Sequence, residues 1–254
     1  MRTSTRPARI IHLVAHRGNA IDCPENTLPA LQSALDLGAR FLEIDVQLAA
    51  DGVPVVIHDA DLLRTANQDL IVTGTDSSVL LATEVAERRR FGERFAGTLL
   101  PALADVVALI SRRPEVTLFV EIKAESLAAF GHDPTVARVV EALRPVRTQC
   151  VVISFDLPAI HRARVQGGVR IGWVLPAYDS HNRLKYEALQ PEFLFCSHQR
   201  LPASGPLWRG PWHWAIYEIR SLEHALVLAE RGADYIETMA VRAMSEAMRA
   251  LAGR

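Results

Sequence analysis

The segment "LGARFLEID" at residues 37–45 joins the end of a helical pattern to an apolar run that closes on two acidic residues. The same plan returns near the other end of the chain, where "RGADYIETM" occupies residues 231–239. In both segments a glycine ends the helix, an alanine follows it, and a short strand-like run carries a glutamate. We interpret this echo as repeated βα architecture.

Strand-like and helix-like segments alternate along the whole chain. Short runs rich in aliphatic and β-branched residues predict strands at 9–16, 40–48, 52–59, 116–123, 149–155, 169–175, 192–197, 212–219 and 233–238. Amphipathic periodicity predicts helices at 27–38, 101–113, 133–144, 156–167, 181–189, 221–232 and 241–252. About eight β/α units in 254 residues predict a single domain over residues 1–254, a (β/α)8 TIM barrel of the α/β class. An open doubly wound sheet is the alternative, but no GxGxxG motif follows the first predicted strand.

Residues 59–100 interrupt this alternation, because they are too long for an ordinary βα loop. Turn-forming residues are spread through them, and a helix is expected at about 78–90. We interpret the segment as a small insertion over one face of the barrel. The "ERRR" run at 87–90 is expected to form a solvated helix face.

Charge and composition argue against several classes of protein. With 28 basic and 29 acidic residues the formal net charge is −1, so no bulk positive field is available for nucleic acid or anionic lipid. No apolar run approaches the length of a membrane span. The apolar run in the basic N-terminal segment is too short for the apolar region of a signal peptide. Cys23, Cys150 and Cys196 lie far apart without CxxC spacing, which favours a reducing cytoplasm over disulfides or a zinc site.

Polar residues stand where several predicted strands end, and in a TIM barrel the carboxyl-terminal strand ends carry the functional site. Side chains two positions apart on a strand face the same way, so "EID" places Glu43 beside Asp45. In the same way, "EIK" places Glu121 beside Lys123. The full set of strand-end candidates is His16, Arg17, Glu43, Asp45, His58, Asp59, Glu121 and Lys123.

Three carboxylates at neighbouring strand ends repel one another and are costly to desolvate. A hard divalent cation such as Mg²⁺ or Ca²⁺, bound by Glu43, Asp45 and Glu121, removes that cost. The alternative is a structural network in which these carboxylates pair with arginines.

Basic and titratable side chains accompany the carboxylates. Arg17 offers a planar fork suited to phosphate oxygens, and Lys123 offers a compact positive charge. With a metal ion they describe a phosphate site. His16 and His58 titrate near neutral pH and can supply a general base and a general acid on either side of a phosphodiester.

The motifs "VAHRG" (14–18), "PENT" (24–27), "GARFLEIDVQLAADGVPVVIHDADLLRT" (38–65), "LPALADVVAL" (100–109) and "FVEIK" (119–123) occur in this order. Together they resemble the glycerophosphodiester phosphodiesterase family. The resemblance implies hydrolysis of glycerophosphodiesters, such as glycerophosphocholine or glycerophosphoethanolamine, to sn-glycerol 3-phosphate and an alcohol. It also implies that the substrate's own glycerol hydroxyl attacks phosphorus, giving a cyclic phosphate that water then opens.

Residue roles are implied by the same resemblance. The family pattern implies a TIM barrel with a small insertion after the first βα units and a divalent cation, Mg²⁺ or Ca²⁺, at its mouth. The implied roles are metal ligation by Glu43, Asp45 and Glu121, acid/base catalysis by His16 and His58, and phosphate binding by Arg17 and Lys123.

The late strands depart from the family pattern. The family reads near "WTVN" where this chain has "WAIYEI", and near "TD" where it has "ETMAV". Glu218 and Glu237 are therefore extra carboxylates that contact either substrate or only solvent. Trp214 and His198 are further candidates for the substrate side. Glu25 of "PENT" is expected to cap the following helix or to support the site from a second layer, and not to bind the metal.

Alternatives stay open at this point. A lysophospholipase D acting on lysolipid diesters needs an apolar groove, for which Leu62, Leu63, Leu80 and Leu81 are available. A non-catalytic phosphodiester-binding protein is expected to have lost at least one ionisable residue of the site, whereas all are present. A tryptophan-rich run, "WRGPWHW" at 208–214, either helps to cage a quaternary ammonium or packs as a loop leading into a strand. The expected partner is a small glycerophosphodiester, without nucleic acid or stable membrane insertion, and the oligomeric state is unassigned.

Overall fold

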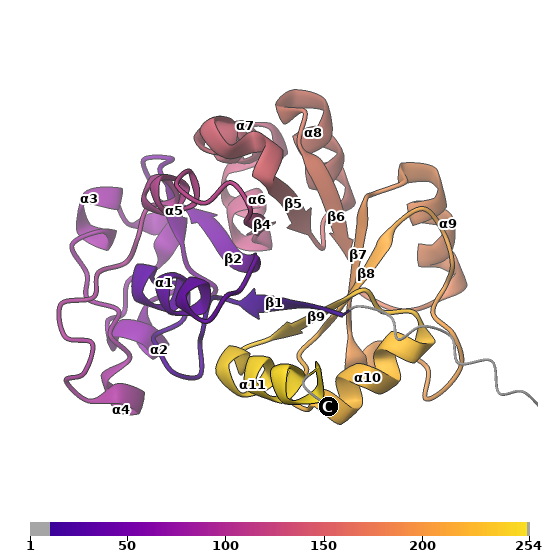
Figure 1. Ribbon diagram of the computed structural model, residues 1–254. Helices are drawn as coiled ribbons and strands as arrows, with labels where there is room; N and C mark the ends of the chain where they lie inside the picture. The colour runs from indigo at the N-terminus through magenta and orange to yellow at the C-terminus, as the bar shows by residue number, and fades with distance from the viewer. Residues whose placement is uncertain (1–10, 253–254) are drawn as a thin grey trace, which may run out of the picture.

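The computed structural model describes residues 11–252 (Figure 1). Its centre is a closed barrel of eight parallel strands, because β1 pairs with β9 on one side and with β2 on the other. The predicted (β/α)8 TIM barrel is thereby confirmed. A short additional strand, β3 (Pro54–Val56), runs antiparallel to β2. The barrel strands are β1 (His12–His16), β2 (Phe41–Leu48), β4 (Thr117–Ile122), β5 (Cys150–Ser154), β6 (Arg170–Val174), β7 (Phe193–Ser197), β8 (His213–Tyr217) and β9 (Tyr235–Thr238).

Helices alternate with the strands and cover the outside of the barrel. Thr27, Asp156 and Asp179 each cap a helix by accepting a hydrogen bond from a backbone N–H three residues further on. The sequence did not predict α6, which is only seven residues long and has no capping side chain before it. The helices are α1 (Leu28–Asp36), α5 (Leu103–Ile110), α6 (Ala124–Phe130), α7 (His132–Leu143), α8 (Leu157–Gly167), α9 (Ser180–Leu189), α10 (Leu222–Arg231) and α11 (Val241–Ala252), with the 3-10 turns η2 (Arg144–Gln149) and η3 (His198–Arg200).

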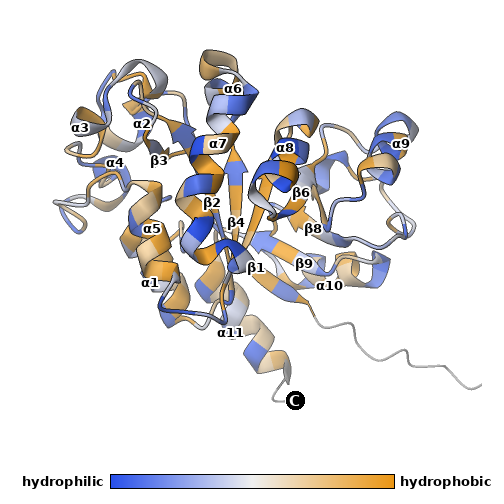
Figure 2. Cartoon of the chain, turned by 90° about the horizontal axis from the view of Figure 1, so that it is seen from above, coloured by the Kyte–Doolittle hydropathy of each residue, from blue (hydrophilic) through white to orange (hydrophobic). Residues whose placement is uncertain are grey.

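Alternation along the strands separates two hydrophobic layers, and hydrophobic residues gather along the strands in Figure 2. Residues such as Val14, Phe119 and Tyr235 point inward and fill the barrel. Their neighbours, such as Leu42 and Ile44, point outward and pack against the helices. Each such fully buried aliphatic side chain contributes about 1.5–3 kcal/mol. The same alternation continues to the strand ends, so it decides which polar side chains face the barrel mouth.

The connection between β3 and α5 contains four short elements, α2 (Leu63–Ala66), η1 (Val72–Gly74), α3 (Ser77–Leu80) and α4 (Arg88–Phe91). Figures 1 and 2 both place α2, α3 and α4 together at one end of the molecule. The segment has a small hydrophobic core of its own, to which Leu62 and Leu80 belong. Both side chains are fully buried, so these two of the four leucines considered for a lipid groove pack inward.

The single helix expected at about 78–90 is wrong. The chain forms α3 and α4 instead, and between them Glu84 pairs with Leu99 in an antiparallel bridge. The backbone N–H of Val85 donates to the carbonyl of Thr98 over 2.8 Å. The backbone here therefore bonds across the segment and not along a helix.

The prediction that the "ERRR" run forms a solvated helix face is also wrong at its first residue, Glu87. Glu87 is buried, with 3% of its surface exposed, and it accepts a hydrogen bond from the backbone N–H of Glu25 over 2.7 Å. Its other carboxylate oxygen pairs with Arg90 at 2.6 Å. Glu87 therefore ties this segment to the "PENT" segment.

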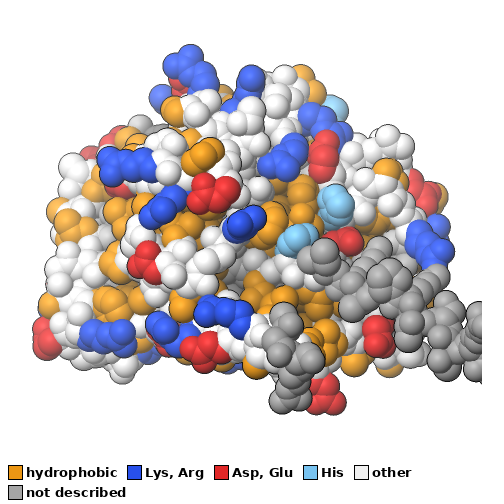
Figure 3. Space-filling model, in the orientation of Figure 1, with side chains coloured by type: hydrophobic (Ala, Val, Ile, Leu, Met, Phe, Trp, Pro, Cys, Tyr) orange, Lys and Arg blue, Asp and Glu red, His pale blue; other side chains and the backbone are white. Residues whose placement is uncertain are grey.

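Within residues 11–252, no helix is both long and apolar enough to cross a membrane. The face shown in Figure 3 mixes basic and acidic side chains and has no broad patch of one sign. Residues 1–10, which make up most of the basic N-terminal segment, lie outside the described residues, and so do the first two residues of the strand expected at 9–16. The cytoplasmic location stays a prediction.

Candidate active site

Three neighbouring strands bring polar side chains together at the carboxyl-terminal mouth of the barrel. The strand register places His16 beside Glu43, and Asp45 beside Glu121. One carboxylate oxygen from each of Glu43, Asp45 and Glu121 lies within 4.8 Å of the other two. The isoleucine inside each E-x-D or E-x-K pair packs in the outer layer, so the prediction that the two polar side chains of each pair share the other face is confirmed.

Two basic side chains neutralise Asp45. The Nε of Arg17 lies 3.0 Å from its Oδ2, and the Nζ of Lys123 lies 3.3 Å from its Oδ1. Arg17 also pairs with Glu25 at 2.9 Å, and Lys123 pairs with Glu121 at 3.1 Å. Burial opposes ionisation of Asp45, but Arg17 and Lys123 outweigh it and hold the pKa of Asp45 below its usual range.

The "PENT" segment holds this group in place. Asn26 donates from Nδ2 to Oδ2 of Asp45 over 2.9 Å and accepts a hydrogen bond from the backbone N–H of Asp45. Glu25 lies between two guanidinium groups, accepting hydrogen bonds from Arg17 and from both Nη atoms of Arg64. Glu25 thus positions Arg17 from a second layer, as the sequence reading allowed.

The cap expected of Glu25 is wrong, because Thr27 makes it. The hydroxyl of Thr27 accepts a hydrogen bond from the backbone N–H of Ala30 over 3.3 Å. Asn26, the residue before this cap, has a left-handed φ of 56°. Its side chain bonds to β2 and not to the helix. An asparagine tolerates this backbone conformation better than most residues, which is the local signal that was available.

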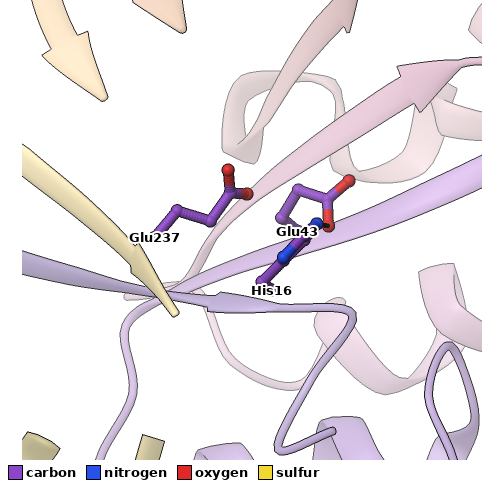
Figure 4. A group of neighbouring side chains, drawn as sticks. All are labelled: His16, Glu43 and Glu237. Atoms are coloured by element: carbon purple, nitrogen blue, oxygen red, sulfur yellow. Dashed lines mark ion pairs between the residues drawn. The ribbon is translucent and has the colours of Figure 1, made fainter. Parts of the chain in front are cut away.

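His16 is surrounded by carboxylates. Its Nδ1 lies 2.8 Å from Oε2 of Glu218, and its Nε2 lies 3.8 Å from Oε2 of Glu43. Glu237 of β9 points toward His16 and Glu43 (Figure 4). Burial opposes protonation of His16, but Glu237 and Glu218 outweigh it and raise the pKa of His16. Burial in turn raises the pKa of Glu237 to about 7.

His58 follows β3, and its side chain is 35% exposed. Its Nδ1 lies 2.7 Å from Oδ1 of Asp59, and the other oxygen of Asp59 accepts a hydrogen bond from Nε of Arg64 over 2.6 Å. Burial lowers the pKa of His58 and outweighs the opposing charge of Asp45. The ring is therefore oriented by Asp59, and its burial favours the neutral form.

Comparison with known proteins adds an independent observation. The model of the glycerophosphoryl diester phosphodiesterase family matches residues 16–168, which is more than half of the chain. The chain belongs to this family. The matched range contains every strand-end candidate that the sequence suggested, from His16 to Lys123.

Relatives in the family match part of the chain. The glycerophosphodiester phosphodiesterase of Caldanaerobacter subterraneus is 39% identical over 112 residues, which is 44% of this chain and 45% of that protein. Glycerophosphodiester phosphodiesterase 1 of Bos taurus is 27% identical over 159 residues, which is 63% of this chain and 47% of that protein. The matches thus span about half the length of these relatives.

Solved structures match almost the entire chain. A phosphodiesterase of Oleispira antarctica, in complex with the product sn-glycerol-3-phosphate, has a TM-score of 0.82 and 25% identity, covering 94% of this chain and 97% of that one. The glycerophosphodiester phosphodiesterase of Thermotoga maritima has a TM-score of 0.69 and 20% identity, covering 93% and 98%. The second likeness concerns the fold alone.

The "HRG" motif that this chain shares with the family ends in a backbone turn. Gly18 has a φ of 79°, and a Cβ at this position would lie 2.6 Å from the backbone carbon of Ala30. Glycine adopts this positive φ without strain. The close approach is to helix α1, so Gly18 lets the mouth of the barrel and α1 come together.

Trp214, in the strand that departs from the family pattern, does not face the barrel mouth. Its side chain is buried in the outer layer, and its Nε1 donates to the carbonyl of Trp208 over 2.8 Å. The expectation that Trp214 lies on the substrate side is wrong, because alternation along β8 turns Tyr217 inward and Trp214 outward.

The tryptophan-rich run packs as a loop against Tyr178 and helix α9. The ring of Trp208 stacks on Tyr178 at 3.7 Å, and Trp212 meets Tyr186 edge to face at 4.3 Å. His198 follows β7 with its ring 5.2 Å from His224. Among the described residues, no contact joins His198 to the carboxylate group.

Proposed function

We propose that this chain hydrolyses glycerophosphodiesters to sn-glycerol 3-phosphate and an alcohol. The observation that carries the proposal is the meeting of Glu43, Asp45 and Glu121 with Arg17 and Lys123 in one barrel mouth. Opposite charges at this density are suited to stabilising a phosphoryl group during transfer. Two relatives support the reaction by name, and the Oleispira antarctica phosphodiesterase was solved with sn-glycerol-3-phosphate as its product.

A divalent cation fits the donors that are present. Glu43, Asp45 and Glu121 offer oxygen atoms alone, which is the donor set that Mg²⁺ and Ca²⁺ prefer. Burial and the charge of Asp45 raise the pKa of Glu43 well above its usual range, which marks a lack of positive charge beside it. These three residues would hold the ion. When bound, it supplies positive charge that stabilises the negative charge gathering on phosphate oxygens.

Arg17 and Lys123 would bind the phosphate while keeping their carboxylate partners. Arg17 donates from Nη1 to Glu25 and directs its Nε at Asp45, which leaves Nη2 for a phosphate oxygen. Lys123 carries three N–H groups on Nζ, and two carboxylates lie within pairing distance of it. Each cation therefore has donor capacity left for an anionic substrate.

His16 and His58 would move the protons. Each ring directs Nδ1 at a carboxylate, Glu218 or Asp59, and so keeps Nε2 for proton transfer. One ring accepts the proton of the glycerol hydroxyl as that oxygen bonds to phosphorus. The other donates a proton to the leaving alcohol oxygen as its bond to phosphorus breaks. Water then opens the cyclic phosphate with the two roles exchanged.

The test is incubation of the purified protein with glycerophosphocholine and a coupled assay for sn-glycerol 3-phosphate. EDTA should abolish release, and added Mg²⁺ or Ca²⁺ should restore it. His16→Ala and Glu43→Ala should each abolish release, whereas Glu230→Gln, on the exposed end of α10, should not. Full activity in both site variants, or release of phosphocholine and glycerol instead, would overturn the proposal.

A further inference from the structure

Glu237 is a buried carboxylate without an arginine or lysine partner among the described residues. Its side chain is 3% exposed, and among the described residues its Oε1 has no hydrogen-bond partner. Within residues 11–252 the carboxylate of Glu237 also makes no ion pair, although two basic side chains, Arg17 and Lys123, lie at the mouth of the barrel. Those two side chains pair with Asp45. Burying a carboxylate in this way is costly unless another positive group takes its charge.

His16 has the hydrogen-bond arrangement of a metal-ligating histidine. Its Nδ1 lies 2.8 Å from Glu218, and a proton on Nδ1 donated to this carboxylate leaves the lone pair on Nε2. A histidine that ligates a metal commonly has a carboxylate on its other nitrogen, which fixes the tautomer and the ring direction. Glu218, the residue directly after β8, supplies that partner.

We propose that His16, Glu43 and Glu237 form a second divalent-cation site beside the carboxylate group of Glu43, Asp45 and Glu121. One ligand atom from each of these three residues lies within 4.8 Å of the other two, and Figure 4 shows the three side chains converging on one space. The buried Oε1 of Glu237, which has no hydrogen-bond partner among the described residues, is available to bind an ion there.

The donor set selects the kind of ion. One imidazole nitrogen with two carboxylates suits Mn²⁺, Fe²⁺ or Zn²⁺ better than Ca²⁺, whereas the neighbouring group offers oxygen alone. Glu43 belongs to both groups, and its two oxygens allow it to bridge two ions. Bridged ions of this kind lie about 3.5–4 Å apart. The mouth of the barrel thus has adjoining sites of different preference.

Occupation of the second site has a consequence that rests on the proposed function. The Nε2 lone pair of His16 cannot bind an ion and accept a proton at the same time. An ion on His16, Glu43 and Glu237 therefore blocks the proton transfer assigned to His16. Mn²⁺ should first activate hydrolysis and then inhibit it as the second site fills.

The direct test is titration of the metal-free protein with Mn²⁺, following free Mn²⁺ by electron paramagnetic resonance. The wild type should bind two ions per chain, and its low-temperature spectrum should show a coupled pair. Glu237→Gln should bind a single ion without coupling. Glu218→Gln should weaken the second site about tenfold to a hundredfold and leave the first unchanged.

Glu230→Gln is the matched control, since it makes the same substitution on an exposed helix position, and it should bind like the wild type. Circular dichroism establishes that each variant is folded before its stoichiometry is interpreted. One ion in both the wild type and Glu237→Gln, or two in both, would overturn the second site. Because the titration does not depend on turnover, a protein inactive on glycerophosphocholine would overturn the proposed function alone.

Discussion

The two sides of the barrel mouth treat their carboxylates differently. On the side of β2 and β4, Asp45 lies between Arg17 and Lys123, and the two cations hold its pKa below the usual range against the effect of burial. On the side of β9, Glu237 is equally buried but pairs with no arginine or lysine among the described residues, and burial raises its pKa to about 7. Residues of the same chemical type thus have opposite tendencies to ionise.

The difference teaches that burial alone does not define the chemistry of a carboxylate. Around Asp45 the protein supplies its own counter-charges, so the group is preorganised as a set of fixed charges for an anionic substrate. Around Glu237 the counter-charge has to come from a proton or a bound cation. His16 stands between the two sides. Its Nε2 lies 3.8 Å from Glu43 on one side, and Glu237 on the other side raises its pKa.

The largest loss of activity is expected when the carboxylate of Asp45, on the side of β2, is removed. Asp45→Asn should lower kcat/KM for glycerophosphocholine at least about a thousandfold, because it removes both a proposed metal ligand and the shared partner of Arg17 and Lys123. Asp36→Asn, at an exposed position of α1, is the control. A loss smaller than tenfold in Asp45→Asn would show that this carboxylate is not part of the reacting site.

A smaller effect is expected when charge is kept and geometry is lost. Arg17→Lys should lower kcat/KM about a hundredfold, because one ammonium cannot pair with Glu25 and Asp45 and still present a donor to phosphate. Steady-state kinetics on the variant and on Arg113→Lys, an exposed control, provide the measurement. Equal activity of Arg17→Lys and the wild type would mean that charge alone matters at this position.

The pairing of Glu25 predicts a pH-dependent effect on stability. Burial opposes ionisation of Glu25, but Arg64 and Arg17 outweigh it and lower its pKa. Because the pKa is lower in the folded state, the stabilisation is present above the unfolded value of about 4.3 and is lost as the pH falls through the folded value. Glu25→Gln should therefore lower the unfolding free energy at pH 7 by about 2 kcal/mol, and less below pH 4. Urea unfolding at both pH values checks this, and a difference independent of pH would contradict it.

The smallest effect is expected on the outer face of the late strands. Trp214→Phe should change kcat/KM less than twofold, because the indole lies in the outer layer and not at the mouth. Loss of its hydrogen bond to Trp208 should lower the unfolding free energy by about 1 kcal/mol. The two measurements are steady-state kinetics and urea unfolding. A large loss of activity at unchanged stability would show that Trp214 does act on the substrate side.

Local patterns predicted the barrel and the first half of the site. Strand alternation has a period of two, so the "EID" and "EIK" runs were enough to place Glu43 with Asp45, and Glu121 with Lys123. The segment at 78–90 shows the limit of this reasoning. Its helical composition is overridden by the pairing of Glu84 with Leu99, which joins residues distant in the sequence.

The sequence by itself determined the alternation of strands and helices, the inward face of each strand and the identity of the strand-end residues, because each of these depends on neighbours along the chain. Only the tertiary structure decided that Glu218 and Glu237 enclose His16. The two glutamates are more than 200 residues from His16 in the chain, and barrel closure through the β1–β9 ladder brings them together. The depth at which a side chain sits depends on this long-range register, which a strand's own sequence does not encode.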